Sequence, residues 1–147
     1  MKIDLERVGD SLDPITFRVA FHSAAERCLL PYPCVTGLKF RNPSGGAAAP
    51  WLTRHLVAAP LDDFVLIPRG RIAFDLHVNI DMKSIQYPWI LELTSGEYDV
   101  QYHYEVDRET DWYDFLAKRS RFVATTPIWR GEIQSNVVRF KLPEAGE

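Results

Sequence analysis

The feature that most constrains this chain is a hydrophobic period of two. Residues 15–22 read ITFRVAFH, residues 71–80 read RIAFDLHVNI, and residues 97–106 read EYDVQYHYEV. In each segment an apolar or aromatic residue recurs at every second position. Because side chains alternate across the two faces of a β-strand, these segments are predicted to be half-buried strands.

Weaker strand patterns and turn residues fill most of the remaining chain. Further strands are predicted at residues 2–8, 35–40, 64–67, 87–93 and 135–142, with an ambiguous segment at 51–57. One short helix is predicted near 109–118, where Trp112, Phe115 and Leu116 recur at helical spacing. About eight short strands without a βαβ rhythm are typical of an antiparallel β-sandwich. We therefore expect an all-β, immunoglobulin-like Greek-key sandwich forming a single domain over residues 1–147.

The charge balance and the hydropathy pattern exclude several classes of function. The chain has 17 basic and 20 acidic residues, a formal net charge of -3. The bases are dispersed, so we expect no nucleic-acid partner. No apolar run reaches the ~20 residues that a membrane helix needs, and the first residues have no secretory leader pattern. The expected location is therefore cytoplasmic, without a membrane partner.

The two cysteines, Cys28 and Cys34, flank the segment LLPYP. In the cytosol they are expected to be reduced thiols, and a buried thiol then acts as a small hydrophobic group. In an exported protein they would instead bridge a small loop, which stays open as an alternative. A zinc site would need more ligands than this segment offers.

A turn motif near the middle of the chain links it to a known architecture. Residues 91–98 read LELTSGEY and contain Leu93-x-x-Gly96-x-Tyr98, the spacing of the tyrosine corner in Greek-key sandwiches. Upstream lies the turn Pro68-Arg69-Gly70, and downstream the segment Ser135-Asn136-x-Val138-x-Phe140. Over residues 64–142 the chain resembles immunoglobulin-like modules of peptidases and their inhibitors. These are the N-terminal domain of deuterolysin-type metallopeptidases and the small intracellular proteinase inhibitors. The resemblance implies the architecture but no site residue.

No segment carries a recognisable catalytic, cofactor or metal motif. Asp75 and His77 share one strand face, and His103 lies on the polar face of another strand, but surface histidines explain this pattern better than a metal site. The acidic run that starts at Glu105 lacks the glycine and the final glutamate of a calcium loop. There is no nucleophile elbow and no phosphate-binding loop. We therefore expect no catalytic residue, no metal and no cofactor.

One acidic and aromatic segment is the best candidate for contact with a protein partner. Its predicted contact residues are Asp107, Glu109, Asp111, Trp112, Tyr113, Asp114 and Phe115. Protein interfaces use such aromatic anchors framed by charge, but the rings of this segment could equally cap an open end of the core, which is the role expected of Trp51 and Trp129. The expected function is a non-catalytic protein-binding module, in its most concrete form a small inhibitor or immunity-type protein that occludes a peptidase or toxin. The alternatives are a structural or assembly subunit and, less favoured, a metal-binding enzyme.

Overall fold

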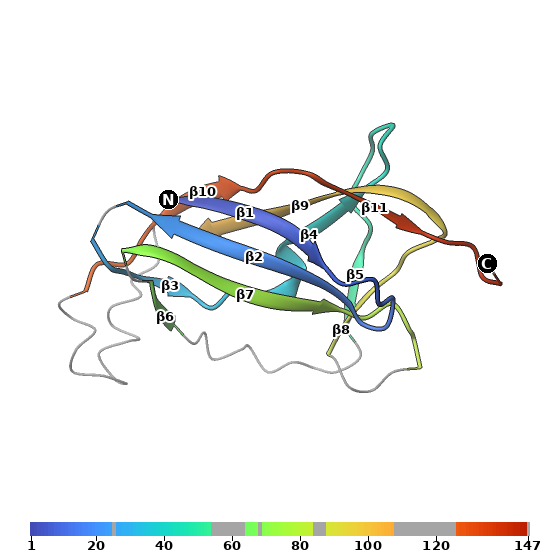
Figure 1. Cartoon of the computed structure of the whole chain (residues 1–147), viewed down its shortest axis with the longest axis horizontal. Coiled ribbons are helices and arrows are strands. Elements are labelled where there is room, and N and C mark those ends of the chain that lie inside the picture. Colours follow the sequence, from blue (N-terminus) through green and yellow to red (C-terminus); the bar gives the residue numbers. More distant parts are fainter. Residues whose placement is uncertain (25, 54–63, 68, 84–87, 108–125, 147) are drawn as a thin grey trace.

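The computed structural model describes the whole chain except residues 25, 54–63, 68, 84–87, 108–125 and 147. The described residues form two antiparallel sheets that face each other as a sandwich (Figure 1). The first sheet has the order β1 (Lys2–Val8), β2 (Ile15–Ser23), β7 (Gly70–Val78). In the second sheet, β9 (Gly96–Val106) pairs on one side with β4 (Leu38–Arg41) and on the other with β10 (Gly131–Gln134) and β11 (Val138–Leu142).

Smaller elements complete the described structure. Two short antiparallel pairs join β3 (Cys28–Pro31) to β6 (Phe64–Ile67) and β5 (Trp51–Thr53) to β8 (Trp89–Leu91). A single 3-10 turn, η1 (Val35–Gly37), precedes β4. The chain crosses to the second sheet between β2 and β4, returns to the first between β4 and β7, and crosses again between β7 and β9, which is the strand order of an immunoglobulin-like sandwich. Within the described residues, no helix is long and apolar enough to cross a membrane.

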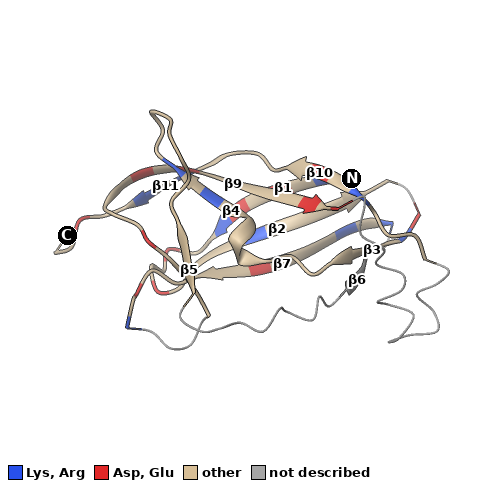
Figure 2. Ribbon diagram, turned by 180° about the vertical axis from the view of Figure 1, so that it is seen from behind, with Lys and Arg blue, Asp and Glu red and all other residues tan. Residues whose placement is uncertain are grey.

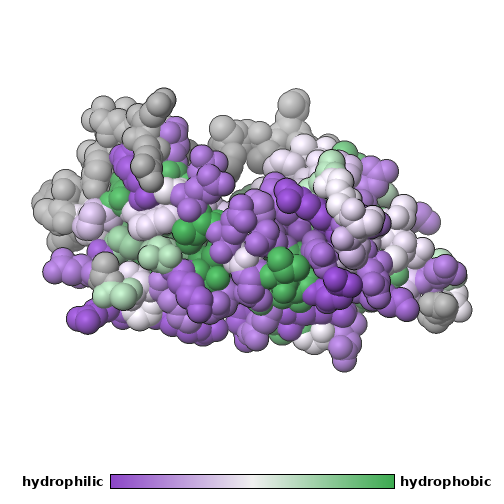
Figure 3. All heavy atoms as spheres, turned by 90° about the horizontal axis from the view of Figure 1, so that it is seen from above, coloured by the Kyte–Doolittle hydropathy of each residue, from purple (hydrophilic) through white to green (hydrophobic). Residues whose placement is uncertain are grey.

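The core lies between the two sheets and is rich in aromatic rings. Phe17 of β2 meets the ring of Phe40 of β4 edge-on at 5.6 Å and that of Phe140 of β11 at 6.2 Å. Toward the other end, Phe21 of β2 meets Tyr104 of β9 at 5.1 Å. Such edge-to-face pairs add to the energy of burial. The surface in Figure 3 is mainly hydrophilic with small separate apolar patches, as expected when the strands bury their apolar faces.

The predicted tyrosine corner is present at the start of β9. The hydroxyl of Tyr98 donates a hydrogen bond to the carbonyl oxygen of Thr94 at 2.7 Å and accepts one from the Thr94 N–H at 3.1 Å. Gly96 between them has a φ of +141°, a conformation that L side chains rarely adopt. The motif therefore fixes the turn from which β9 starts, and this sequence prediction is confirmed.

A bulge between β10 and β11 links the two sheets at one edge of the sandwich. Gln134 lies opposite His103 and Val138 lies opposite Val100, so the intervening residues 135–137 face only two residues of β9. The bulge turns Asn136 toward β1. Its side-chain amide accepts a hydrogen bond from the Leu5 N–H at 2.8 Å and donates one to the Leu5 carbonyl at 3.0 Å. A side chain thus takes the place of a neighbouring strand for β1.

The predicted strands differ from the observed ones in several places. Residues 35–40 are predicted to be one strand, but their first half is the turn η1, in which the Gly37 N–H donates to the Cys34 carbonyl oxygen at 3.1 Å. β3 and β10 were not predicted; each is held by partners far away in the sequence. The ambiguous segment 51–57 contributes the short strand β5. The helix expected near 109–118 lies outside the described residues.

Candidate functional site

A groove of about 500 Å³ runs along the end of β9. One wall is the segment between Pro31 and Lys39, and the other wall is formed by residues 102–106 of β9 together with Glu132 of β10. We call it the β9 groove. It lies on the side of the molecule shown in Figure 2, where β4 and β9 face the viewer.

Two tyrosines of the core hold the first wall in place. The hydroxyl of Tyr104 donates to the carbonyl oxygen of Pro31 at 2.6 Å, and that of Tyr102 donates to the carbonyl oxygen of Cys34 at 3.0 Å. Burial is the main reason that the pKa of Tyr102 is raised well above its usual value, so its hydroxyl keeps the proton that it donates. A Cβ added at Gly37 would lie only 2.6 Å from the Tyr102 ring. The wall is therefore packed closely onto the core.

The first wall presents an aromatic ring and a thiol to solvent. Tyr32 is 56% exposed, while one side of its ring meets Phe74 edge-on at 5.1 Å. Cys34 is an exposed free cysteine whose sulfur accepts a hydrogen bond from the Thr36 hydroxyl at 3.1 Å. Cys28 is also free but buried, and burial raises the pKa of its thiol. The two cysteines thus lie in different environments and are not bridged.

The second wall contains a histidine whose proton position follows from its neighbours. The Gln101 amide nitrogen donates to the Ser135 carbonyl at 2.8 Å, so its amide oxygen faces Nε2 of His103 at 3.1 Å. An oxygen there requires a hydrogen on Nε2. Burial, followed by the charges of Arg41 and Lys39, lowers the pKa of His103. The imidazole is therefore neutral at neutral pH.

The acidic side chains of the second wall face each other. Glu105 and Glu132 are directly opposite in the antiparallel register of β9 and β10, and both are exposed. The lysine of the groove does not pair with them, because the Lys39 ammonium donates to the carbonyl of Thr36 at 3.2 Å. The groove therefore combines an exposed aromatic ring with two carboxylates that no described residue neutralises.

Asp75 and His77, two of the three residues compared with a metal site in the sequence analysis, have other hydrogen-bond partners. Both carboxylate oxygens of Asp75 accept hydrogen bonds from Arg18, at 2.8 and 3.2 Å, and Nδ1 of His77 lies 3.0 Å from the Thr16 hydroxyl. His103 is in the other sheet. In the part of the chain that the structure describes, no three His, Cys, Asp or Glu side chains form a group able to hold a metal ion.

Of the predicted contact segment, the structure describes only the first residue. Asp107 follows β9 directly and is exposed, and its carbonyl oxygen accepts a hydrogen bond from Arg130 at 3.2 Å. The six others lie outside the described residues: Glu109, Asp111, Trp112, Tyr113, Asp114 and Phe115. Trp51 and Trp129 are both partly buried against the core, as predicted.

The sequence did not indicate the residues of the β9 groove as a site. Tyr32 and Glu132 come from segments 100 residues apart, and only the folded register brings their walls together. A tyrosine between two prolines, in Pro31-Tyr32-Pro33, was the one local signal of an exposed ring. No family model, no curated protein and no solved structure matches this chain.

Proposed function

We propose that this chain is a non-catalytic protein-binding module, and in its most concrete form an inhibitor or immunity-type protein that occludes a partner enzyme such as a peptidase or toxin. The observation that supports it is Tyr32, which is 56% exposed on a wall that two core tyrosines hydrogen-bond into place. An exposed tyrosine on a fixed wall loses little conformational entropy when a partner covers it. Such rings are frequent among the residues that dominate binding energy.

The segment that the sequence analysis proposes for partner contact begins beside the groove. Val106 lines the groove and Asp107 follows it, so the predicted segment 107–115 starts where the groove ends. Loops carried by a rigid sandwich are a common way to build a binding surface. A partner seated on Tyr32 would therefore lie next to the start of that segment.

Capture of the tagged full chain from its native lysate, followed by mass spectrometry, tests this proposal. We expect one enzyme in stoichiometric amount, and a Tyr32→Ala variant that binds it at least tenfold more weakly, since truncating an anchor residue costs about 2 kcal/mol or more. Met82→Ala, which shortens another exposed side chain (52% exposed), is the matched control and should bind normally. Thermal unfolding of both variants establishes that they are folded.

Two results would contradict the proposal. Recovery of the chain alone, or of the components of one large assembly, would favour a structural subunit instead. Equal binding by the wild type and by a folded Tyr32→Ala variant would remove the observation on which the proposal rests.

A further inference from the structure

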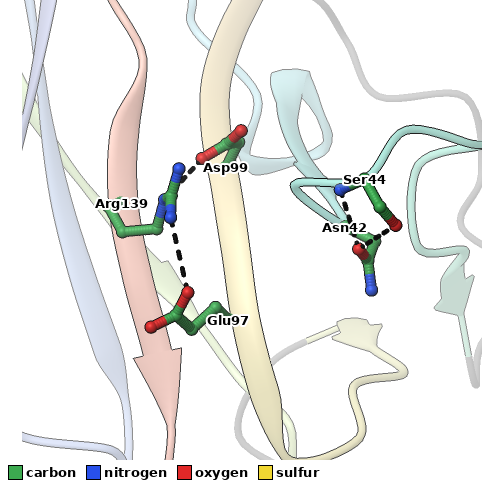
Figure 4. A network of polar contacts seen from close by, with 5 residues as sticks. All are labelled: Asn42, Ser44, Glu97, Asp99 and Arg139. Atoms are coloured by element: carbon green, nitrogen blue, oxygen red, sulfur yellow. Dashed lines mark hydrogen bonds and ion pairs between the residues drawn. The ribbon is translucent and has the colours of Figure 1, made fainter.

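Most acidic side chains of the described strands form an ion pair with a basic side chain. Arg18 pairs with Asp75 at 2.8 Å and with Glu6 at 3.7 Å, and Asp4 pairs with His22 at 2.8 Å. On β9, Arg139 pairs with Asp99 at 2.7 Å and with Glu97 at 3.4 Å (Figure 4). Among the described strands, only Glu105 and Glu132 have no ion pair. Both line the β9 groove.

The register of β9 shows how unusual this pair is. Glu97 lies opposite Lys141 and Asp99 lies opposite Arg139, so near the start of β9 every outward acid faces a base. Near its end, Glu105 faces Glu132. Directly opposed side chains of an antiparallel pair have Cβ atoms ~4.5–5.5 Å apart, and like charges in that position are destabilising. Among the described residues, Glu105 and Glu132 therefore place two like charges side by side in a groove that also has an exposed ring.

We propose that the β9 groove binds a basic segment of a protein partner, with an arginine or lysine side chain between Glu105 and Glu132 and its neighbours against Tyr32. This inference rests on the proposed function and adds the chemistry of the partner. Charge complementarity identifies the occupant, since a guanidinium or ammonium group would neutralise both carboxylates and form charge-assisted hydrogen bonds. The exposed ring of Tyr32 provides apolar contact for the rest of the segment.

A metal ion is a poorer occupant of the same place. Calcium takes about six to eight oxygen ligands, and zinc prefers nitrogen or sulfur ligands in a set of four. Within the described residues, Glu105 and Glu132 are not joined by a third metal-ligating side chain. A protein cation brings its own hydrogen-bond donors and needs only the two acceptors present.

The first test compares the unfolding temperature of a variant with its affinity for a basic peptide. Glu105→Gln keeps the shape of the side chain and removes the repulsion, so the free protein should unfold at the same or a slightly higher temperature. It should nevertheless bind a basic peptide about tenfold more weakly, as expected for loss of a charge-assisted contact. The matched control is Glu97→Gln on the same strand, which should not stabilise the protein and should not change binding.

The probe is a phage-displayed library of random dodecapeptides, selected on the immobilised full chain. We expect sequences enriched in arginine or lysine from the wild type and from Glu97→Gln, and no such enrichment from a Glu105→Gln, Glu132→Gln double variant. Binding of a selected synthetic peptide should weaken as salt rises. Selected peptides without basic residues, or equal enrichment on the double variant, would overturn the inference.

Three further outcomes show whether this inference, the proposed function or both fail. If calcium or zinc chloride raises the unfolding temperature of the wild type but not of the double variant, the carboxylates hold a metal and the inference is wrong. If the double variant still captures a stoichiometric partner from lysate while Tyr32→Ala does not, the proposed function stands and only the basic-segment inference fails. If no variant, including the wild type, binds peptide or partner, both fail.

Discussion

Ser135 provides the sharpest test of how the bulge is stabilised. Its hydroxyl accepts a hydrogen bond from the Tyr102 N–H at 2.8 Å and donates one to the Asn136 carbonyl at 2.7 Å. Ser135 is 5% exposed and Tyr102 is 1% exposed, so water has little access to these groups. The substitution Ser135→Ala removes the hydroxyl and keeps the backbone bond from the Ser135 N–H to the Tyr102 carbonyl.

The expected loss of stability follows from the Tyr102 N–H, which Ser135→Ala leaves without its hydrogen-bond acceptor. A buried N–H without a partner costs about 1–3 kcal/mol, and with a second bond also lost we expect ~2 kcal/mol. Unfolding entropy is about 2.1 cal/mol/K per residue near 60 °C, or roughly 0.3 kcal/mol/K for a chain of 147 residues. The unfolding temperature of Ser135→Ala should therefore fall by about 6 °C.

Urea unfolding measures the free energy of unfolding. Hydrogen exchange monitored by NMR shows whether the lost protection is at the Tyr102 amide. The Tyr102 amide should exchange faster in Ser135→Ala than in the wild type. Ser95→Ala, at an exposed serine in the turn before β9, is the control and should change the free energy of unfolding by less than about 0.5 kcal/mol. A Ser135→Ala variant as stable as this control, with its Tyr102 amide still protected, would refute the reasoning.

Two further predictions concern the tyrosines of β9. Tyr98→Phe removes the hydroxyl that bonds the Thr94 backbone, and because that corner is exposed we expect a loss of only about 1 kcal/mol in the free energy of unfolding, measured in urea. A loss above ~3 kcal/mol would show that the corner does more than hold the turn. For Tyr102, burial raises the pKa in the folded state above its unfolded value near 10, so its contribution to stability is complete below pH 10 and is lost as pH rises further. The free energy of unfolding should fall by about 1.4 kcal/mol per pH unit above pH 10 through this group, and a Tyr102→Phe variant should have a shallower slope; equal slopes would contradict the assignment.

The strands that were predicted well are those whose burial is visible in their own residues. In β2, β7 and β9, apolar residues alternate with polar ones because one face lies on the core, and the pattern needs no knowledge of partners. The tyrosine corner was equally visible, since Tyr98 and Thr94 are four residues apart and its bonds are local.

The strand and the acidic pair that the sequence did not predict depend on contacts between distant residues. β10 reads GEIQ and has no convincing alternation; it is a strand because β9 pairs with it. Likewise, Glu105 and Glu132 become a pair only through the register, which a single sequence does not reveal. The contact segment predicted from Asp107 to Phe115 stays a prediction, since the structure describes only its first residue.

The link between Leu5 and Asn136 has a consequence for how the protein folds during synthesis. The first sheet is complete in sequence once Val78 has been made, yet part of its apolar face waits for Phe140 and its β1 edge waits for Asn136. Ribosomes add roughly 5–20 residues per second, so the growing chain spends several seconds with an uncovered sheet. Until β10 and β11 have been made, this apolar face is the kind of transiently exposed surface that chaperones bind.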